Sequence, residues 1–134
     1  MNGTVKKFIY KVYGEYAYTK TTDISEQTDE NNSDDDQLLY IPKNMANGFI
    51  YGSLSGYYLS WSINYIGERN TTKKPLLAYC LNNISIGKKW CKTNVDVDIR
   101  FKVNNLFDIE YQAIQWRAMP GRNYELSIKL RLKK

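Results

Sequence analysis

The stretch that decides the fold is Asn94-Val-Asp-Val-Asp-Ile-Arg-Phe-Lys-Val-Asn104, in which apolar and polar residues alternate without a break. The C-terminal run from Tyr124 to Leu132 alternates in the same way. Because successive side chains of a β-strand point to opposite faces, each run predicts a strand with one apolar and one charged face. The two faces must therefore meet two different environments.

Four further alternating runs precede these two. The predicted strands cover residues 5–21, 37–54, 57–70, 76–88, 94–104 and 122–134. Tight turns follow the second and fourth strands, at 53–56 and 88–92, and longer polar segments follow the first, third and fifth strands, at 25–37, 71–75 and 105–121. The pattern predicts an all-β fold, an antiparallel up-and-down meander of about six long strands, with the long loops at one end and the tight turns at the other.

Size and charge narrow the class of protein. A chain of 134 residues fits one domain and leaves no room for two large cores. The formal net charge of +5 comes from Lys and Arg scattered along the strands. No zinc-finger or RNA-recognition motif accompanies them, so we expect no nucleic acid among the partners.

The sequence offers no chemistry for catalysis. It has no histidine, the usual zinc ligand and the usual base of a catalytic triad. The acidic run Asp34, Asp35 and Asp36 could supply oxygen ligands, but its spacing matches no EF-hand and predicts a hydrated loop. Cys80 and Cys91 are expected about 30 Å apart along the chain, at about 3.3 Å per residue, and therefore unpaired. We expect no enzyme, no cofactor and no metal.

Two architectures share the alternation. In a small soluble β-barrel the apolar faces point inward and form a core or a cavity for an apolar ligand. In an outer-membrane barrel they point to lipid, and the polar faces line a lumen. Strands of about 10–14 residues match the roughly 9–11 needed to cross a bilayer at a tilt. Aromatic residues near strand ends, such as Tyr57 and Tyr65, and the unequal loops also favour the membrane barrel.

Two motifs near the C-terminus are Val103-Asn-Asn-Leu-Phe-Asp-Ile-Glu-Tyr111 and Met119-Pro-Gly-Arg-Asn-Tyr124. Together they resemble the C-terminal end of TonB-dependent outer-membrane receptors. Segments 40–47 and 62–69 are similar to the preceding family segments, so the resemblance covers nearly the whole chain. The motif residues expected to have structural roles are Asn104, Asn105, Leu106, Phe107, Asp108, Tyr111, Pro120, Gly121 and Arg122.

This resemblance implies a role in transport. The family imports scarce, bulky nutrients such as siderophore-iron, cobalamin or glycans across the cell outer membrane, through a barrel of the 22-stranded, plugged type. The chain would supply the last six strands, with segments 29–36, 71–75 and 105–121 outside the cell. The implied partners are outer-membrane lipid, the remaining barrel strands and the plug domain, with TonB reached only through that plug. The alternative function is a small soluble β-barrel that binds an apolar ligand.

The chain also departs from the family pattern. It shows no plug domain, no TonB-binding segment and no signal peptide, and it ends Leu132-Lys-Lys134 where the family usually ends in an aromatic residue. We therefore interpret residues 1–134 as the C-terminal segment of a receptor β-barrel, a fragment of a transporter.

Several side-chain roles follow from this interpretation. Asn104 and Asn105 are expected to bond backbone groups where the strand ends, and Arg122 to pair with a loop carboxylate. Leu106 and Phe107 are expected to anchor the base of the loop. Between the last two strands, Asp96 and Asp98 are expected to approach Lys129, Arg131 or Lys133.

Overall fold

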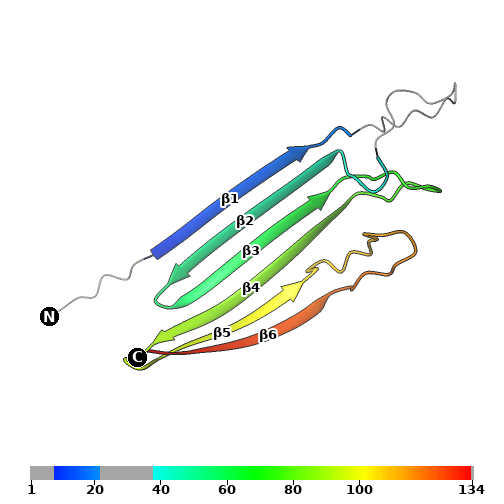
Figure 1. The fold of residues 1–134 in the computed structure, drawn as a ribbon. Coiled ribbons are helices and arrows are strands. Elements are labelled where there is room, and N and C mark those ends of the chain that lie inside the picture. The colour runs from blue at the N-terminus through cyan, green and yellow to red at the C-terminus, as the bar shows by residue number, and fades with distance from the viewer. Residues whose placement is uncertain (1–7, 22–37, 134) are drawn as a thin grey trace, which may run out of the picture.

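The computed structural model describes residues 8–21 and 38–133, which form a single layer of antiparallel strands (Figure 1). The six strands lie side by side in the order β1-β2-β3-β4-β5-β6. They are β1 (Phe8–Tyr18), β2 (Asn44–Leu54), β3 (Tyr57–Ile66), β4 (Tyr79–Cys91), β5 (Val95–Asn104) and β6 (Asn123–Leu132). No helix forms within the described residues. The predicted all-β meander of six antiparallel strands is confirmed.

The two ends of the sheet differ as predicted. The tight connections β2–β3 and β4–β5 lie at one end, where β1 begins and β6 ends, and the longer connections lie at the other (Figure 1). We call these the turn end and the loop end. In the β2–β3 turn, Ser55 and Gly56 have φ angles of 52° and 85°. Positive φ at both central residues is typical of the type I′ turn, whose twist matches that of the flanking strands.

Several strand boundaries differ from the prediction, among them the end of β1, which is Tyr18 rather than residue 21. The β2 strand begins at Asn44 rather than at 37, because Tyr40 has a φ of 63° and its N–H donates to the Asn70 carbonyl at 2.8 Å. Pro42 then follows, a residue that cannot donate a ladder hydrogen bond. The β3 strand ends at Ile66 rather than at 70, so the loop after it is longer than 71–75.

The β4 strand is shifted by three residues toward the C-terminus, covering Tyr79–Cys91 instead of 76–88. At its start, Leu76 pairs only with Arg69, in an isolated bridge. At its end, residues 88–91, which were predicted as a basic turn, pair with residues 96–99. The acidic residues of β5 lie opposite this basic segment, which favours continued pairing. The predicted loop 25–37, with Asp34, Asp35 and Asp36, and residues 5–7 of the first predicted strand lie outside the described residues.

The sheet has no hydrophobic core of its own. Among the described residues, Leu76 is the only buried apolar one, and strand residues such as Leu132 are as much as 83% exposed. A soluble domain buries many of its large apolar side chains. The sheet is open, since β1 and β6 pair only with β2 and β5. The described strands therefore do not form the closed small barrel of the alternative interpretation.

Candidate functional site

The register gives the sheet one continuous apolar face. A row of directly opposed residues crosses all six strands, and residues opposite each other point to the same side. This row contains Val12, Ile50, Trp61, Ile84, Val103 and Tyr124. We call the side on which this row lies the apolar face. Within the six strands, Lys88 is the only charged residue on it.

Aromatic side chains mark both margins of the apolar face. Phe8, Tyr10, Tyr57 and Trp90 lie toward the turn end, and Tyr16, Tyr18, Tyr65 and Tyr124 lie toward the loop end. At about 3.3 Å per residue, Tyr57 and Tyr65 lie roughly 26 Å apart along β3. A strand tilt of about 40° would reduce this to about 20 Å of height, close to the roughly 25 Å apolar band of membrane barrels.

The opposite face, which we call the polar face, carries matched charges. Asp96 lies opposite Arg131, and Asp98 lies opposite Lys129, so the predicted approach of β5 acids to β6 cations is confirmed. The Lys133 ammonium contacts Asp96 Oδ1 at 2.7 Å. Asp98 accepts its short hydrogen bond from a neutral group instead, the Tyr58 hydroxyl, at 2.7 Å.

The bond from Tyr58 to Asp98 crosses a whole strand, because β4 lies between β3 and β5. Gly87 of β4 is the residue directly opposite Tyr58. A Cβ atom at Gly87 would lie 2.4 Å from Tyr58 Cζ and 2.7 Å from the Ile99 carbonyl oxygen. The absence of a side chain therefore lets the tyrosine ring cross β4. A glycine within a strand is the sequence signal for such a close approach.

Replacing Gly87 by Ala is expected to lower the unfolding free energy by about 1–3 kcal/mol, because the added methyl displaces the Tyr58 ring. The matched control is Gly14→Ala, since a Cβ atom at Gly14 meets nothing within 4 Å. This control should leave stability unchanged or slightly higher. Urea unfolding of the refolded protein in detergent micelles measures both variants. Equal effects would contradict the packing of Tyr58 over Gly87.

In the first motif, residues 103–111, the backbone forms a closed turn at Asn105, which has a φ of 51° and is only 3% exposed. Its side chain accepts from the Ile109 N–H and donates to the Ile109 carbonyl, both at 2.9 Å. Its own N–H donates to Asn83 Oδ1 at 3.0 Å. The predicted backbone bonding is confirmed for Asn105. It was wrong for Asn104, whose amide donates to the Asn123 side chain at 2.9 Å.

The motif ends where Asp108 meets the start of β6. Asp108 Oδ1 accepts the backbone N–H of Arg122 at 2.7 Å. Arg122 thus meets a loop carboxylate through its backbone N–H, whereas the prediction gave this contact to its side chain. A Cβ atom at Gly121 would lie 2.9 Å from the same oxygen, so the motif glycine makes this contact possible. Pro120, just before it, is exposed.

The two apolar motif residues behave differently. Leu106 is half-buried, and its N–H donates to the Asn82 carbonyl at 2.7 Å, so it holds the base of the loop as predicted. Phe107 is 61% exposed, which contradicts the predicted anchoring role. The left-handed backbone at Asn105 and Asp108 turns the segment sharply on both sides of it. Phe107 therefore stands outside the packed base of the loop.

Arg69 joins two loops, a role that no sequence pattern predicted. Its buried guanidinium donates to the carbonyls of Gln112 and Ala113 at 2.8 and 3.0 Å. The guanidinium also lies 5.1 Å from the centre of the Tyr79 ring. The centres of the Tyr79 and Tyr111 rings are 4.7 Å apart. The pKa of the Tyr111 phenol is raised, mainly because the group is partly buried and to a smaller extent because Tyr79 is close to it. The motif residue Tyr111 thus belongs to an aromatic pair that supports the loop end.

No protein-family model matches the sequence. Among residues 8–21 and 38–133, no group of three or more His, Cys, Asp or Glu is placed to hold a metal ion. Cys80 and Cys91 are both free thiols, as predicted. No helix suited to crossing a bilayer occurs in the part of the chain that the structure describes. The functional features of the described residues are thus the two contrasting faces and the braced loop end.

Proposed function

We propose that this chain forms the C-terminal strands of an outer-membrane β-barrel of the TonB-dependent receptor type, which imports a scarce, bulky nutrient such as siderophore-iron, cobalamin or a glycan. The observation that carries the proposal is the apolar face that extends across all six strands of a sheet without a core. The motif residues from Asn104 to Arg122 add the family resemblance. In this proposal the six strands continue into the remainder of a barrel of about 22 strands.

The energetics favour lipid as the cover for the apolar face. On β6 alone, this face exposes Tyr124, Leu126, Ile128, Leu130 and Leu132. Fully burying one such side chain stabilises a protein by about 1.5–3 kcal/mol relative to leaving it in water. Facing lipid removes this unfavourable exposure without requiring a second protein layer. The aromatic residues at both margins would then lie at the membrane interfaces.

The open edges identify the first protein partner in this proposal. In lipid, every backbone N–H and C=O needs a hydrogen-bond partner, so a sheet cannot present free edges. The outer edges of β1 and β6 are unpaired by any strand of the described residues. The remaining strands of the receptor barrel would pair with them. The polar face would line the lumen and meet the plug domain, through which TonB acts.

The orientation follows from the unequal ends of the sheet. Membrane barrels have short periplasmic turns and longer extracellular loops. The turn end would therefore lie in the periplasm, and the loop end would lie outside the cell. The segments braced by Arg69 and Asn105 would then be extracellular, where such receptors first meet their cargo. Their bonding suggests a rigid rim beside the cargo route.

The test is expression of the 134-residue chain with and without detergent. We expect aggregation in buffer and a dispersed, β-rich species in detergent micelles, measured by size-exclusion chromatography and circular dichroism. Replacing Leu126, Ile128 and Leu130 together by Ser should reduce aggregation in buffer. The matched control replaces Glu125, Ser127 and Lys129 of the polar face by Ala and should not reduce it. A monodisperse soluble monomer with a cooperative thermal transition would contradict the proposal.

A further inference from the structure

Lys88 is a cation on an otherwise uncharged face. Its ammonium donates to the Tyr57 hydroxyl at 2.6 Å and lies 4.0 Å from the centre of the Tyr57 ring and 5.0 Å from that of Trp90. No carboxylate pairs with Lys88 among the described residues. An ammonium has three N–H donors, so two remain for a ligand. An anion is the ligand that these donors and this charge favour.

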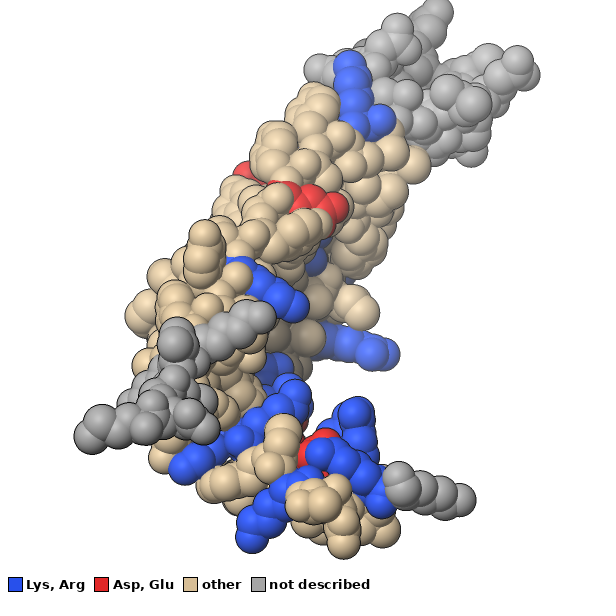
Figure 2. Space-filling model, turned by 90° about the vertical axis from the view of Figure 1, so that its left-hand side faces the viewer, with Lys and Arg blue, Asp and Glu red and all other residues tan. Residues whose placement is uncertain are grey.

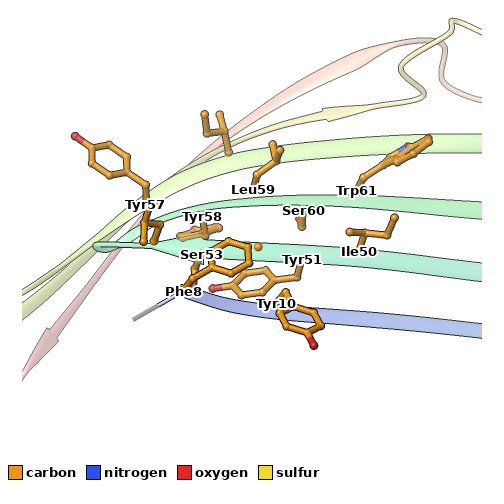
Figure 3. A pocket seen from close by; sticks show the side chains of 13 residues that line it. Phe8, Tyr10, Ile50, Tyr51, Ser53, Tyr57, Tyr58, Leu59, Ser60 and Trp61 are labelled. Atoms are coloured by element: carbon orange, nitrogen blue, oxygen red, sulfur yellow. The ribbon is translucent and has the colours of Figure 1, made fainter. Parts of the chain in front are cut away.

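An apolar groove of about 530 Å³ lies beside Lys88 on the same face. Its lining includes Phe8 and Tyr10 of β1, Leu59 and Trp61 of β3, and Ile86 of β4 (Figure 3). Gly52 of β2 lies between Tyr10 and Leu59 in the register and has no side chain to fill the hollow. Tyr57 both lines the groove and contacts the Lys88 ammonium. The groove and the cation therefore form one continuous surface.

The surrounding charge has the same sign. Basic side chains gather toward the turn end of the molecule, at the lower end of the view in Figure 2. In sequence they include Lys88, Lys89, Lys92, Lys129, Arg131 and Lys133, all at or near the strand ends that meet there. Asp96 and Asp98 offset part of this charge on the polar face, where they lie opposite Arg131 and Lys129. The apolar face has no such acid in its strands.

We propose that the apolar face binds one anionic phospholipid at the turn end, with its phosphate on Lys88 and an acyl chain along the groove over Gly52. This inference rests on the proposed membrane location. The turn end corresponds to the periplasmic leaflet in that arrangement, which makes a phospholipid the occupant. A phosphate accepts bonds from an ammonium, and the lined groove suits a hydrocarbon chain. Tyr57 and Trp90 would flank the headgroup at the membrane interface.

The test uses tryptophan quenching in vesicles. The full chain carries Trp61→Phe and Trp116→Phe, so that Trp90, next to Lys88, is the sole reporter. It is refolded into two vesicle preparations of identical phosphatidylglycerol and phosphatidylcholine content, which differ only in which lipid carries brominated acyl chains. Because the surface charge is the same in both, any difference reports which lipid adjoins Trp90.

We expect phosphatidylglycerol to be enriched about fivefold over phosphatidylcholine at Trp90, the effect of one Lys near an anionic surface. Lys88→Gln should remove this enrichment. The matched control, Lys89→Gln, changes the net charge equally but lies on the opposite face of the same strand, and it should retain the enrichment. Gly52→Val, which fills the groove but keeps Lys88, should reduce it.

Each outcome has a distinct meaning. Strong quenching of Trp90 by both brominated lipids in proportion to their content would overturn the lipid site while supporting membrane insertion. Equal loss of enrichment in Lys88→Gln and Lys89→Gln would also overturn the site, because it would indicate general charge attraction. No quenching by either lipid would overturn the membrane location itself, and the lipid site with it.

Discussion

Replacing Val12 by Lys is expected to lower the unfolding free energy in phospholipid vesicles by about 2–4 kcal/mol, the cost of a Lys near the bilayer midplane on a lipid-facing strand position. Val12 lies in the central part of β1 and belongs to the apolar row that crosses the sheet. The measurement is urea unfolding of the chain in vesicles, followed by tryptophan fluorescence.

The neighbouring change, Tyr13→Lys, is the matched control. Val12 and Tyr13 are 71% and 56% exposed in the sheet. If both faces met only water, the two substitutions should therefore have similar effects on the unfolding free energy. Tyr13 points to the polar face and hydrogen-bonds Glu15, a carboxylate that a Lys there can also meet. We expect Tyr13→Lys to cost less than about 1 kcal/mol, as at a wet position with a nearby acid. Similar costs for both variants would exclude lipid as the cover for the apolar face.

Asn105→Ala is expected to lower the unfolding free energy by about 2–4 kcal/mol, because it removes two hydrogen bonds to the half-buried backbone of Ile109 and leaves those groups unsatisfied. The φ of 51° adds to the effect, since Asn adopts the left-handed region more readily than Ala. The loop from 105 to 122 should also become sensitive to protease. Limited proteolysis with mass spectrometry would locate the new cleavage sites.

The adjacent Asn104→Ala serves as the control for this loop. Its side-chain bond to Asn123 is a cross-strand contact between exposed amides, which should contribute no more than about 1 kcal/mol. The loop should stay resistant to protease in this variant. If Asn104→Ala opened the loop as much as Asn105→Ala, the closed turn at Asn105 would not be what holds the loop.

Much of the fold could be predicted because the alternation is local and nearly complete. The strand from 95 to 104 was predicted within one residue, since its period is unbroken and its turn is short. The start of β2 could not be predicted, because the residues around Tyr40 and Pro42 are apolar enough to continue a strand. The bond from Tyr40 to Asn70 on another loop decides that boundary, and no local pattern reports it.

Of the candidate site, only the residues that belong to the two C-terminal motifs could be predicted from the sequence. Asn105, Asp108 and Gly121 make local contacts that residue type and spacing suggest. Arg69 resembles any exposed charge in the sequence, yet it is buried by a loop more than forty residues away. Lys88 was predicted as part of a basic turn, because the three-residue shift of β4 that puts it on the apolar face depends on pairing with β5.

The open meander has a consequence for how the sheet can assemble. Each strand pairs only with its neighbours in sequence, so forming any pair requires closing only the single connection between the two strands. Hairpins can therefore be added one after another, each new strand using the free edge of the last as its template. If assembly in this order stops after any strand, the last strand added still has a free edge with which the next strand can pair. The same geometry that leaves the outer edges of β1 and β6 without a partner strand among the described residues lets further strands join from either side.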